Sequence, residues 1–329
     1  MQKIQVTPND AGRRLDRFLR KYLERATLGS IYKIIRKDVK VNGKRQDSSY
    51  VLEPGDEITL YLSDEMLGNL TAPTKKDSPR KKIRKTFTVI YEDENILVAD
   101  KPFGLLTHGD RTEKKNHLAN QVKDYLITNG EYNPRDERVF SPAPANRLDR
   151  NTTGLVLFGK NSNSLRTLNR WIRESRVSKY YRTVVFGHLN EKLVLRGRLE
   201  KDEETNTARI LDVDADEGRE IETIVTPVQQ LDNATLVEIE LVTGRTHQIR
   251  AHLASIGHPV IGDSKYAKGK GAKAFNHRMF EECELSTQLL HSYRLELHDC
   301  DGEFSYLEGR VFCAPLPEQF ENIVRKLNG

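Results

Sequence analysis

A carboxylate lies between two arginines in the segment Arg147-Leu148-Asp149-Arg150, and no other part of the sequence is better suited to covalent chemistry. Hydroxyl residues and Gly154 follow, and then an apolar run at 155–158 that is typical of a buried strand. Because opposite charges nearby favour the ionised form, the flanking guanidiniums are expected to hold Asp149 as a carboxylate. An ionised carboxylate can act as a nucleophile. The alternative is an ion-pair cluster on the surface, which contributes little to stability.

Four motifs follow one another along most of the chain. They are Lys-Pro-Phe-Gly at 101–104, Asn-Arg-Leu-Asp-Arg-Asn-Thr-Thr-Gly at 146–154, Lys-Tyr-Tyr-Arg-Thr-Val-Val-Phe-Gly at 179–187 and Gly-Arg-Thr-His-Gln-Ile-Arg-Ala-His-Leu at 244–253. In this order they resemble the motifs of the RluA/RluC-type ribosomal large-subunit pseudouridine synthases. Asn146 is a departure, because the family usually has His at that position, but it leaves Asp149 untouched.

This resemblance implies a reaction in which uracil detaches from its ribose, turns and rejoins through a ring carbon. Asp149 matches the family's essential carboxylate, which attacks either carbon six of the uracil or the anomeric carbon of the ribose, and the sequence does not choose between these atoms. Tyr181 matches the family's active-site tyrosine, whose ring stacks on the uracil and whose phenol assists removal of the ring proton. A half-buried strand tyrosine with a packing role is the alternative.

Further residues take roles from the same resemblance. Arg245 is expected to pair with the Asp149 carboxylate and to orient it, in a fork geometry that lysine would not reproduce. Ile249 is expected to line the base pocket, although packing is the ordinary role of an apolar helix residue. Because a stacked base must be extruded, at a cost of roughly a few kcal/mol, Arg147 is expected to enter the vacated stack.

Metal and cofactor motifs are not recognisable in the sequence. His247 and His252 are five residues apart, so they lie on different sides of a helix, unlike the i, i+4 pair of a zinc protease. No glycine-rich loop follows a strand in either nucleotide-binding pattern. We therefore expect no metal ion and no cofactor, since an isomerisation that cuts and remakes one glycosidic bond needs neither a redox centre nor a phosphate donor.

The composition limits the class of protein and its surroundings. The 329 residues include 53 basic and 48 acidic ones, and the net charge of +5 favours a polyanionic partner only if the positive charge is clustered. Three cysteines show neither a metal nor a disulfide pattern, so a reducing cytosol is expected. The N-terminus lacks the apolar segment of a signal peptide, and no apolar run has the length that spans a membrane. We expect a cytoplasmic, monomeric protein without a membrane partner.

Positive charge is clustered in residues 1–63. Apolar residues recur at helical spacing from 15 to 23, a second short helix is expected after Ser30 as its cap, and Asn42-Gly43 is a strong hairpin signal after a strand at 39–41. This order resembles the small RNA-binding module named after ribosomal protein S-four, and a solvated basic surface is the alternative. The residues expected to contact RNA, mainly through its phosphates, are Arg13, Arg14, Arg17, Lys33, Arg36, Lys37, Lys40, Asn42 and Lys44.

The rest of the chain is expected to form a linker and a catalytic domain. Residues 64–86 are polar and basic with Gly68, Pro73 and Pro79, which indicates a flexible linker. In residues 87–329 the expected strands outnumber the helices and do not alternate regularly with them, so an α+β fold fits better than a doubly wound α/β fold. The resemblance implies a bent, mostly antiparallel mixed sheet with the active site in a central cleft.

The sequence therefore predicts an RNA pseudouridine synthase that acts on large-subunit ribosomal RNA. Transfer RNA is the alternative substrate, because members of the family divide between the two. An alternative of another class is a catalytically silent RNA-binding factor of ribosome assembly, but Asp149, Tyr181 and Arg245 argue against it. A hydrolase with Asp149 as general base is less favoured, since no second acid or metal is placed to help.

Overall fold

The structure is a computed structural model that describes residues 1–71, 83–134, 137, 139–202 and 207–329. The chain divides into two compact units. The first consists of Met1–Lys85, Asn120–Ala143 and Gly159–Arg166, and the second consists of Thr86–Ala119, Pro144–Phe158 and Thr167–Gly329. Segments 120–143 and 159–166 thus group with the N-terminal unit, although the sequence places them in a catalytic domain at 87–329.

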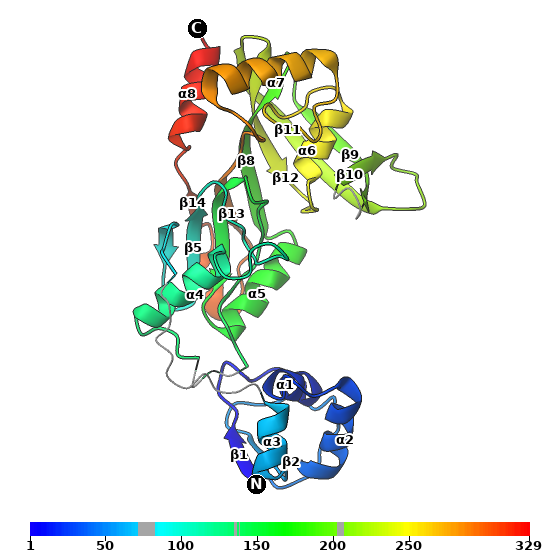
Figure 1. Ribbon diagram of the computed structural model, residues 1–329, viewed down its shortest axis with the longest axis vertical. Coiled ribbons are helices and arrows are strands. Elements are labelled where there is room, and N and C mark those ends of the chain that lie inside the picture. Colours follow the sequence, from blue (N-terminus) through cyan, green and yellow to red (C-terminus); the bar gives the residue numbers. More distant parts are fainter. Residues whose placement is uncertain (72–82, 135–136, 138, 203–206) are drawn as a thin grey trace. The chain divides into compact units, whose positions relative to one another are not determined.

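A small sheet and two helices form the N-terminal part of the first unit (Figure 1). In chain order the elements are β1 (Gln2–Gln5), α1 (Leu15–Tyr22), α2 (Leu28–Asp38), β2 (Val39–Val41) and β3 (Glu57–Leu60), and the antiparallel strands lie in the order β1-β3-β2. The turn predicted after β2 is confirmed. Asn42 and Gly43 have φ values of 50° and 74°, and a type I′ turn requires positive φ at both central positions.

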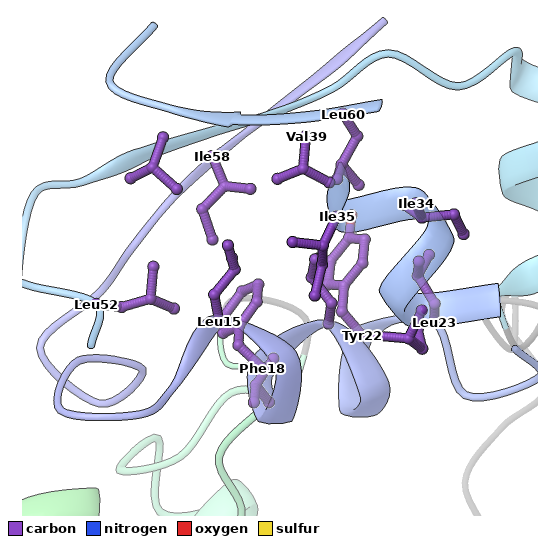
Figure 2. Close-up of a cluster of buried hydrophobic side chains, with 14 of the residues drawn as sticks. Leu15, Phe18, Tyr22, Leu23, Ile34, Ile35, Val39, Leu52, Ile58 and Leu60 are labelled. Atoms are coloured by element: carbon purple, nitrogen blue, oxygen red, sulfur yellow. The ribbon is translucent and has the colours of Figure 1, made fainter. Parts of the chain in front are cut away.

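The apolar stripe predicted at residues 15–23 forms the core of this part. Leu15, Phe18, Leu19, Tyr22 and Leu23 are all buried in one cluster. Figure 2 shows side chains of α1, α2 and β3 converging on that cluster. The stripe is buried because residues at i, i+3, i+4 and i+7 share one face of a helix.

Two predictions for this part of the chain are wrong. Helix α2 begins at Leu28, before Ser30, and its cap is Thr27, whose side chain accepts a hydrogen bond from the Ser30 amide. The expected linker 64–86 begins with a helix, α3 (Asp64–Leu70), capped by Ser63. Leu67 of α3 packs against the core of the first unit, which explains why the segment is helical. The predicted linker residues 72–82 lie outside the described residues.

Within the described residues, a second sheet of eleven strands runs through the rest of the chain (Figure 1). Its main path has the order β10-β9-β11-β12-β8-β13-β7-β5-β4, with β14 on β13 and β6 on β7. Seven pairs are antiparallel, namely β10 with β9, β9 with β11, β11 with β12, β12 with β8, β8 with β13, β13 with β14 and β5 with β4, and the pair of β13 with β7 is parallel. The strands are β4 (Thr88–Glu92), β5 (Ile96–Lys101), β6 (Ala143–Pro144), β7 (Thr153–Gly159), β8 (Val177–Phe186), β9 (Leu193–Asp202), β10 (Thr207–Leu211), β11 (Arg219–Leu231), β12 (Ala234–Leu241), β13 (Leu290–Leu297) and β14 (Val311–Cys313).

Helices accompany this sheet at irregular places in the sequence. They are α4 (Leu118–Thr128), α5 (Ser162–Arg173), α6 (Gln248–Ser255), α7 (Lys270–Cys283), a short 3-10 helix η1 (Gly302–Leu307) and α8 (Glu318–Leu327). Trp171 of α5 is fully buried and packs edge-on against Phe304 of η1. The predicted α+β class with a mostly antiparallel sheet is confirmed, because runs of several strands separate the helices.

Gly154 allows the parallel pairing of β7 with β13 to form. Its φ is 106°, and a Cβ atom at this position would lie 2.1 Å from the carbonyl oxygen of Ser292. Only glycine adopts this conformation without strain and leaves room for so close a backbone contact. The residue therefore lets β7 join β13 directly after the loop that contains Asp149.

None of the helices described here has the length and apolar character that crossing a membrane would require.

Candidate active site

The loop that carries Asp149 runs between β6 and β7 and is held on both sides of this residue. On one side, the Thr107 hydroxyl lies 2.9 Å from the carbonyl oxygen of Leu148 and 3.1 Å from its amide nitrogen. On the other side, the ammonium of Lys101 donates to the carbonyl oxygen of Arg150 at 3.0 Å. Because the backbone is held on both sides of Asp149, the direction in which its side chain leaves the loop is fixed.

The carboxylate of Asp149 contacts cationic or polar groups that come from the fourth motif. Its Oδ2 atom lies 3.3 Å from Nη1 of Arg250 and 3.7 Å from Nε2 of His247. Both contacts go to the same oxygen, so Oδ1 faces away from them. This leaves one carboxylate oxygen available to a ligand.

The arginines expected around Asp149 differ from those found there. Arg150 pairs with Asp110 at 3.5 Å and donates to the hydroxyl of Thr112. Arg147 is exposed and makes no ion pair with Asp149. The flanking guanidiniums, which were expected to hold Asp149 as a carboxylate, therefore form no ion pair with it among the described residues, and Arg150 pairs with Asp110 instead.

Arg250, and not Arg245 as the sequence predicts, makes the contact with Asp149. Its guanidinium forms a two-pronged pair with Asp263, with Nε–Oδ2 at 2.7 Å and Nη2–Oδ1 at 3.0 Å, and its third nitrogen faces Asp149. The Arg250 side chain is 8% exposed and that of Asp263 is 1% exposed. A buried, two-pronged ion pair of this kind between a guanidinium and a carboxylate holds the guanidinium in one orientation, so Arg250 can orient Asp149.

A signal in the sequence could have identified Arg250. It follows Ile249 and precedes Ala251, and the neighbouring apolar residues of α6 are buried. A charged residue in a buried helical segment has to be paired, and Asp263 is the first acidic residue after α6 in the sequence. Arg245, by contrast, precedes the helix and is exposed.

Gln248 fixes the junction between the loop and α6. Its side-chain oxygen accepts from the backbone amide of Arg245 and from the hydroxyl of Thr243, and its amide group donates to Thr223 and to the carbonyl oxygen of Glu222. The preceding residue, His247, has a left-handed φ of 57°. Gln248 and His247, which bonds the hydroxyl of Tyr266, therefore both have structural hydrogen bonds, although His247 also faces Asp149.

Tyr181 is buried on β8, and its pKa is raised to about 12. Burial is the main cause, the nearby Ser292 hydroxyl opposes it, and the negative charge of Asp149 adds to it. The phenol is therefore neutral at pH 7. A neutral phenol donates a hydrogen bond and presents an aromatic face, but it is a poor proton acceptor.

Lys101 was not identified as a site residue from the sequence, although it begins the first motif. It is completely buried, and its ammonium donates to the carbonyl oxygens of Pro102, Leu105 and Arg150 at 3.1, 2.7 and 3.0 Å. Burial lowers its pKa to about 7, while the charges of Asp149 and Asp100 act in the opposite direction. Lys101 thus ties the turn of the first motif to the Asp149 loop.

A cavity of about 280 Å³ in the second unit brings the predicted site residues together. Asp149, Tyr181, Arg245, Arg147 and Ile249 all line it. Lys179 lines it as well. Among the described residues, no side chain forms an ion pair or a hydrogen bond with the side chains of Arg147, Lys179 or Arg245. The site therefore combines one oriented carboxylate, one buried aromatic ring and several cations that are available to an anionic or carbonyl-rich ligand.

The residues predicted to contact RNA in the N-terminal module are placed in several ways. Arg17, Lys33, Arg36, Lys37 and Lys44 are exposed. Arg13 is half-buried, and Arg14 pairs with Asp16 at 2.9 Å. Lys40 is half-buried with its ammonium over the ring of Tyr61. The side chain of Asn42 bonds Asp56 and the amide of Glu57, so it is engaged in the turn.

Comparisons with known proteins identify the family of this chain. Residues 95–255 match the family described as RNA pseudouridylate synthase. The "Ribosomal large subunit pseudouridine synthase C" of Vibrio vulnificus (strain CMCP6) is 32% identical, over 99% of this chain and 96% of the relative. The protein of the same name from Escherichia coli (strain K12) is 31% identical, over 98% and 96% of the two chains.

A solved structure supports the fold. The protein titled "Human RNA Pseudouridylate Synthase Domain Containing 4" has a TM-score of 0.57 with 19% identity, and the match covers 73% of this chain and 92% of the human one. The four motifs that resemble this family lie within a similarity that extends along nearly the whole chain. The chain therefore belongs to the RNA pseudouridylate synthase family of isomerases.

Proposed function

We propose that this chain converts uridine to pseudouridine in large-subunit ribosomal RNA with Asp149 as the nucleophile. The observation that carries the proposal is the Asp149 carboxylate, which Arg250 holds by one oxygen at the wall of a cavity shared with Tyr181. The name of the relatives from Vibrio vulnificus and Escherichia coli supports ribosomal RNA as the substrate rather than transfer RNA.

In this mechanism Oδ1 of Asp149 attacks, because Oδ2 is engaged by Arg250 and lies near His247. The attacked atom is either carbon six of the uracil or the anomeric carbon of the ribose. In both routes the covalent adduct divides one difficult step into two easier ones. The guanidinium of Arg250 orients the carboxylate, and Asp263 orients the guanidinium.

Tyr181 provides a surface on which the uracil stacks, and its hydroxyl donates a hydrogen bond. The pKa of about 12 keeps its phenol protonated, so we assign removal of the ring proton to another group. Asp149 is the one carboxylate among the described residues that line the cavity. After the adduct breaks down, this carboxylate is free again and can accept the proton from the ring carbon.

The substrate base has to leave the RNA stack before it enters the cavity. Arg147 is exposed at the cavity wall without a protein partner among the described residues. A planar guanidinium can replace the extruded base in the stack. We propose this role for Arg147, and we propose that Arg245, which is also exposed there, contacts the RNA backbone.

The N-terminal module is proposed to bind RNA phosphates through the exposed cations of α2, which are Lys33, Arg36 and Lys37. Phosphate contacts provide affinity and register rather than sequence choice. The proposed division of labour is therefore that residues 1–63 hold the RNA and that the central cleft of the second unit carries out the reaction.

The experiment compares pseudouridine maps of ribosomal RNA from cells with and without the gene, and then tests the purified protein. Asp149→Asn is nearly isosteric and removes the nucleophilic charge, so release of tritium from carbon five of labelled uracil should stop. Asp299→Asn is the matched control, because Asp299 is exposed, does not line the cavity and has a left-handed φ that asparagine tolerates. Substantial tritium release by Asp149→Asn, or unchanged ribosomal RNA maps, would contradict the proposal.

A further inference from the structure

Lys179 is a buried lysine without a partner. It is 7% exposed on β8, and no hydrogen bond or ion pair with its ammonium exists among the described residues. Burial alone lowers its pKa. A lysine that is largely removed from water without a compensating contact destabilises the fold, so Lys179 makes no polar contact that would explain its place in the core.

Lys101, by contrast, is a buried lysine whose ammonium is fully hydrogen-bonded by the protein. Its buried ammonium donates to three backbone carbonyl oxygens, as many as it has protons. Lys179 has no such acceptors from the protein. A ligand in the cavity that Lys179 lines can supply them.

The position of Lys179 indicates which part of a nucleotide it meets. It precedes Tyr181 by two residues on β8, so the two side chains lie on the same face of the sheet about 7 Å apart. A ring stacked on Tyr181 would therefore present an edge to Lys179. The phosphates, by contrast, are expected at the exposed guanidiniums of Arg147 and Arg245, since charged groups remain near water.

We propose that the ammonium of Lys179 donates a hydrogen bond to a carbonyl oxygen of the extruded uracil. The proposal rests on the pseudouridine synthase function proposed above. If Asp149 attacks the ribose, the glycosidic bond breaks and its electron pair stays on the uracil, shared between the ring nitrogen and the carbonyl oxygens. If Asp149 attacks carbon six, the electron pair of the ring double bond moves toward the carbonyl at carbon four. In either route Lys179 stabilises negative charge on an oxygen.

The same contact would select uracil over cytosine. An ammonium donates hydrogen bonds and accepts none. Uracil has a carbonyl oxygen at carbon four, where cytosine has an amino group that also donates. Two donors facing one another in a buried site are unfavourable, so Lys179 acts against cytosine as well as for uracil.

The first test replaces Lys179 with methionine, which has a similar length and no charge. We expect the single-turnover rate at saturating enzyme to fall about 100-fold, the scale for loss of one donor to a developing oxyanion, while the Kd for RNA changes little. The melting temperature should rise, because an unpaired buried charge has been removed. Lys273→Met on α7 is the control, since Lys273 is exposed and does not line the cavity.

The alternative ligand is a phosphate, and the same variant distinguishes it. Loss of a phosphate contact would weaken RNA binding and lower the slope of log K against log salt by about 0.7 to 0.9, with little effect on the rate at saturation. That outcome would overturn the proposal. An unchanged rate, Kd and salt slope would also overturn it.

The second test changes the substrate and compares the wild type with Lys179→Met on it. In an RNA with one mapped site, the target uridine is replaced by 2-thiouridine or by 4-thiouridine, whose sulfur is a weaker acceptor than oxygen. The wild type should react more slowly with at least one thio substrate than with uridine. Lys179→Met should react with that thio substrate almost as fast as it reacts with uridine, because the contact is already absent, and this is the coupling expected of two groups in contact. Independent, multiplicative losses on both thio substrates would refute the contact. A wild type that forms no pseudouridine in any RNA would instead refute the proposed function.

Discussion

Replacement of Arg250 by methionine should separate the stability of the site from its chemistry. Arg250 makes two hydrogen bonds, at 2.7 and 3.0 Å, with an Asp263 side chain that is only 1% exposed. Removing one partner of a buried ion pair leaves an uncompensated charge, which costs about 3–5 kcal/mol of unfolding free energy. We expect Arg250→Met to lose this amount and to lose turnover, because Asp149 is no longer oriented.

A second substitution tests the reasoning behind that magnitude. In Arg250→Met combined with Asp263→Asn, the buried charge is gone, and the amide oxygen can still accept from the backbone amides of Lys265 and Tyr266, as Oδ1 of Asp263 does. Most of the lost stability should return. Turnover should not return, because nothing replaces the contact of Arg250 with Asp149.

Urea unfolding followed by tryptophan fluorescence measures these changes. Trp171 is the single tryptophan of the chain, and it is fully buried in the second unit, so it reports on the unit that contains the site. Arg209→Met is the control, since Arg209 and its partner Glu200 are 72% and 40% exposed and such a pair contributes at most about 1 kcal/mol. A loss under about 1 kcal/mol for Arg250→Met would refute the argument from burial. Restored turnover in the double variant would show that Arg250 supports the fold only.

Four further predictions follow from the same contacts. Tyr181→Phe keeps the stacking ring and loses a hydroxyl that is neutral at pH 7, so the turnover rate should fall by less than the roughly 100-fold typical of a general base; a larger loss would return proton removal to the phenol. Arg147→Ala should slow modification of a hairpin far more than that of an unstructured strand in single-turnover assays, because only the hairpin carries the extrusion cost, and equal losses would exclude a stacking role. Combined replacement of Lys33, Arg36 and Lys37 by alanine should reduce the salt dependence of RNA binding by up to about 0.7 to 0.9 per phosphate contact, whereas an unchanged slope would show that α2 does not touch RNA. Burial lowers the pKa of His252 to about 4, so between pH 4 and 6.5 the unfolded chain binds more protons than the folded one, and the free energy of unfolding falls as the pH decreases. His252→Asn should remove up to about 1.4 kcal/mol per pH unit of this dependence. Superimposable curves of stability against pH for the wild type and the variant would contradict the assignment.

Sequence patterns are sufficient to predict those parts of the structure that depend only on neighbouring residues in the chain. The apolar stripe from Leu15 to Leu23 was identified because helix periodicity alone determines which side chains share a face. The turn at Asn42-Gly43 was identified because few residues tolerate positive φ. The cap of α2 and the extent of α3 were missed, since several residues near each helix end can cap it and the choice depends on packing.

For the candidate site, the sequence predicts which residues take part, but not which of them are in contact. The sequence by itself determined that Asp149, Tyr181, Ile249, Arg147 and Arg245 belong to one set, and the cavity contains all of them. It did not determine which cation faces the carboxylate. Arg147 and Arg150 lie within two residues of Asp149 in the chain and do not pair with it, while Arg250, which is 101 residues from Asp149, makes the contact.

The tertiary structure also decided the state of the buried lysines. Lys101 and Lys179 have similar surroundings in the sequence, each at the start of a motif. Only the packed chain shows that one ammonium meets three carbonyl oxygens and that the other meets none among the described residues. The physical reason is that desolvation and pairing depend on which distant segments cover a side chain, and residue type and spacing carry no information about that.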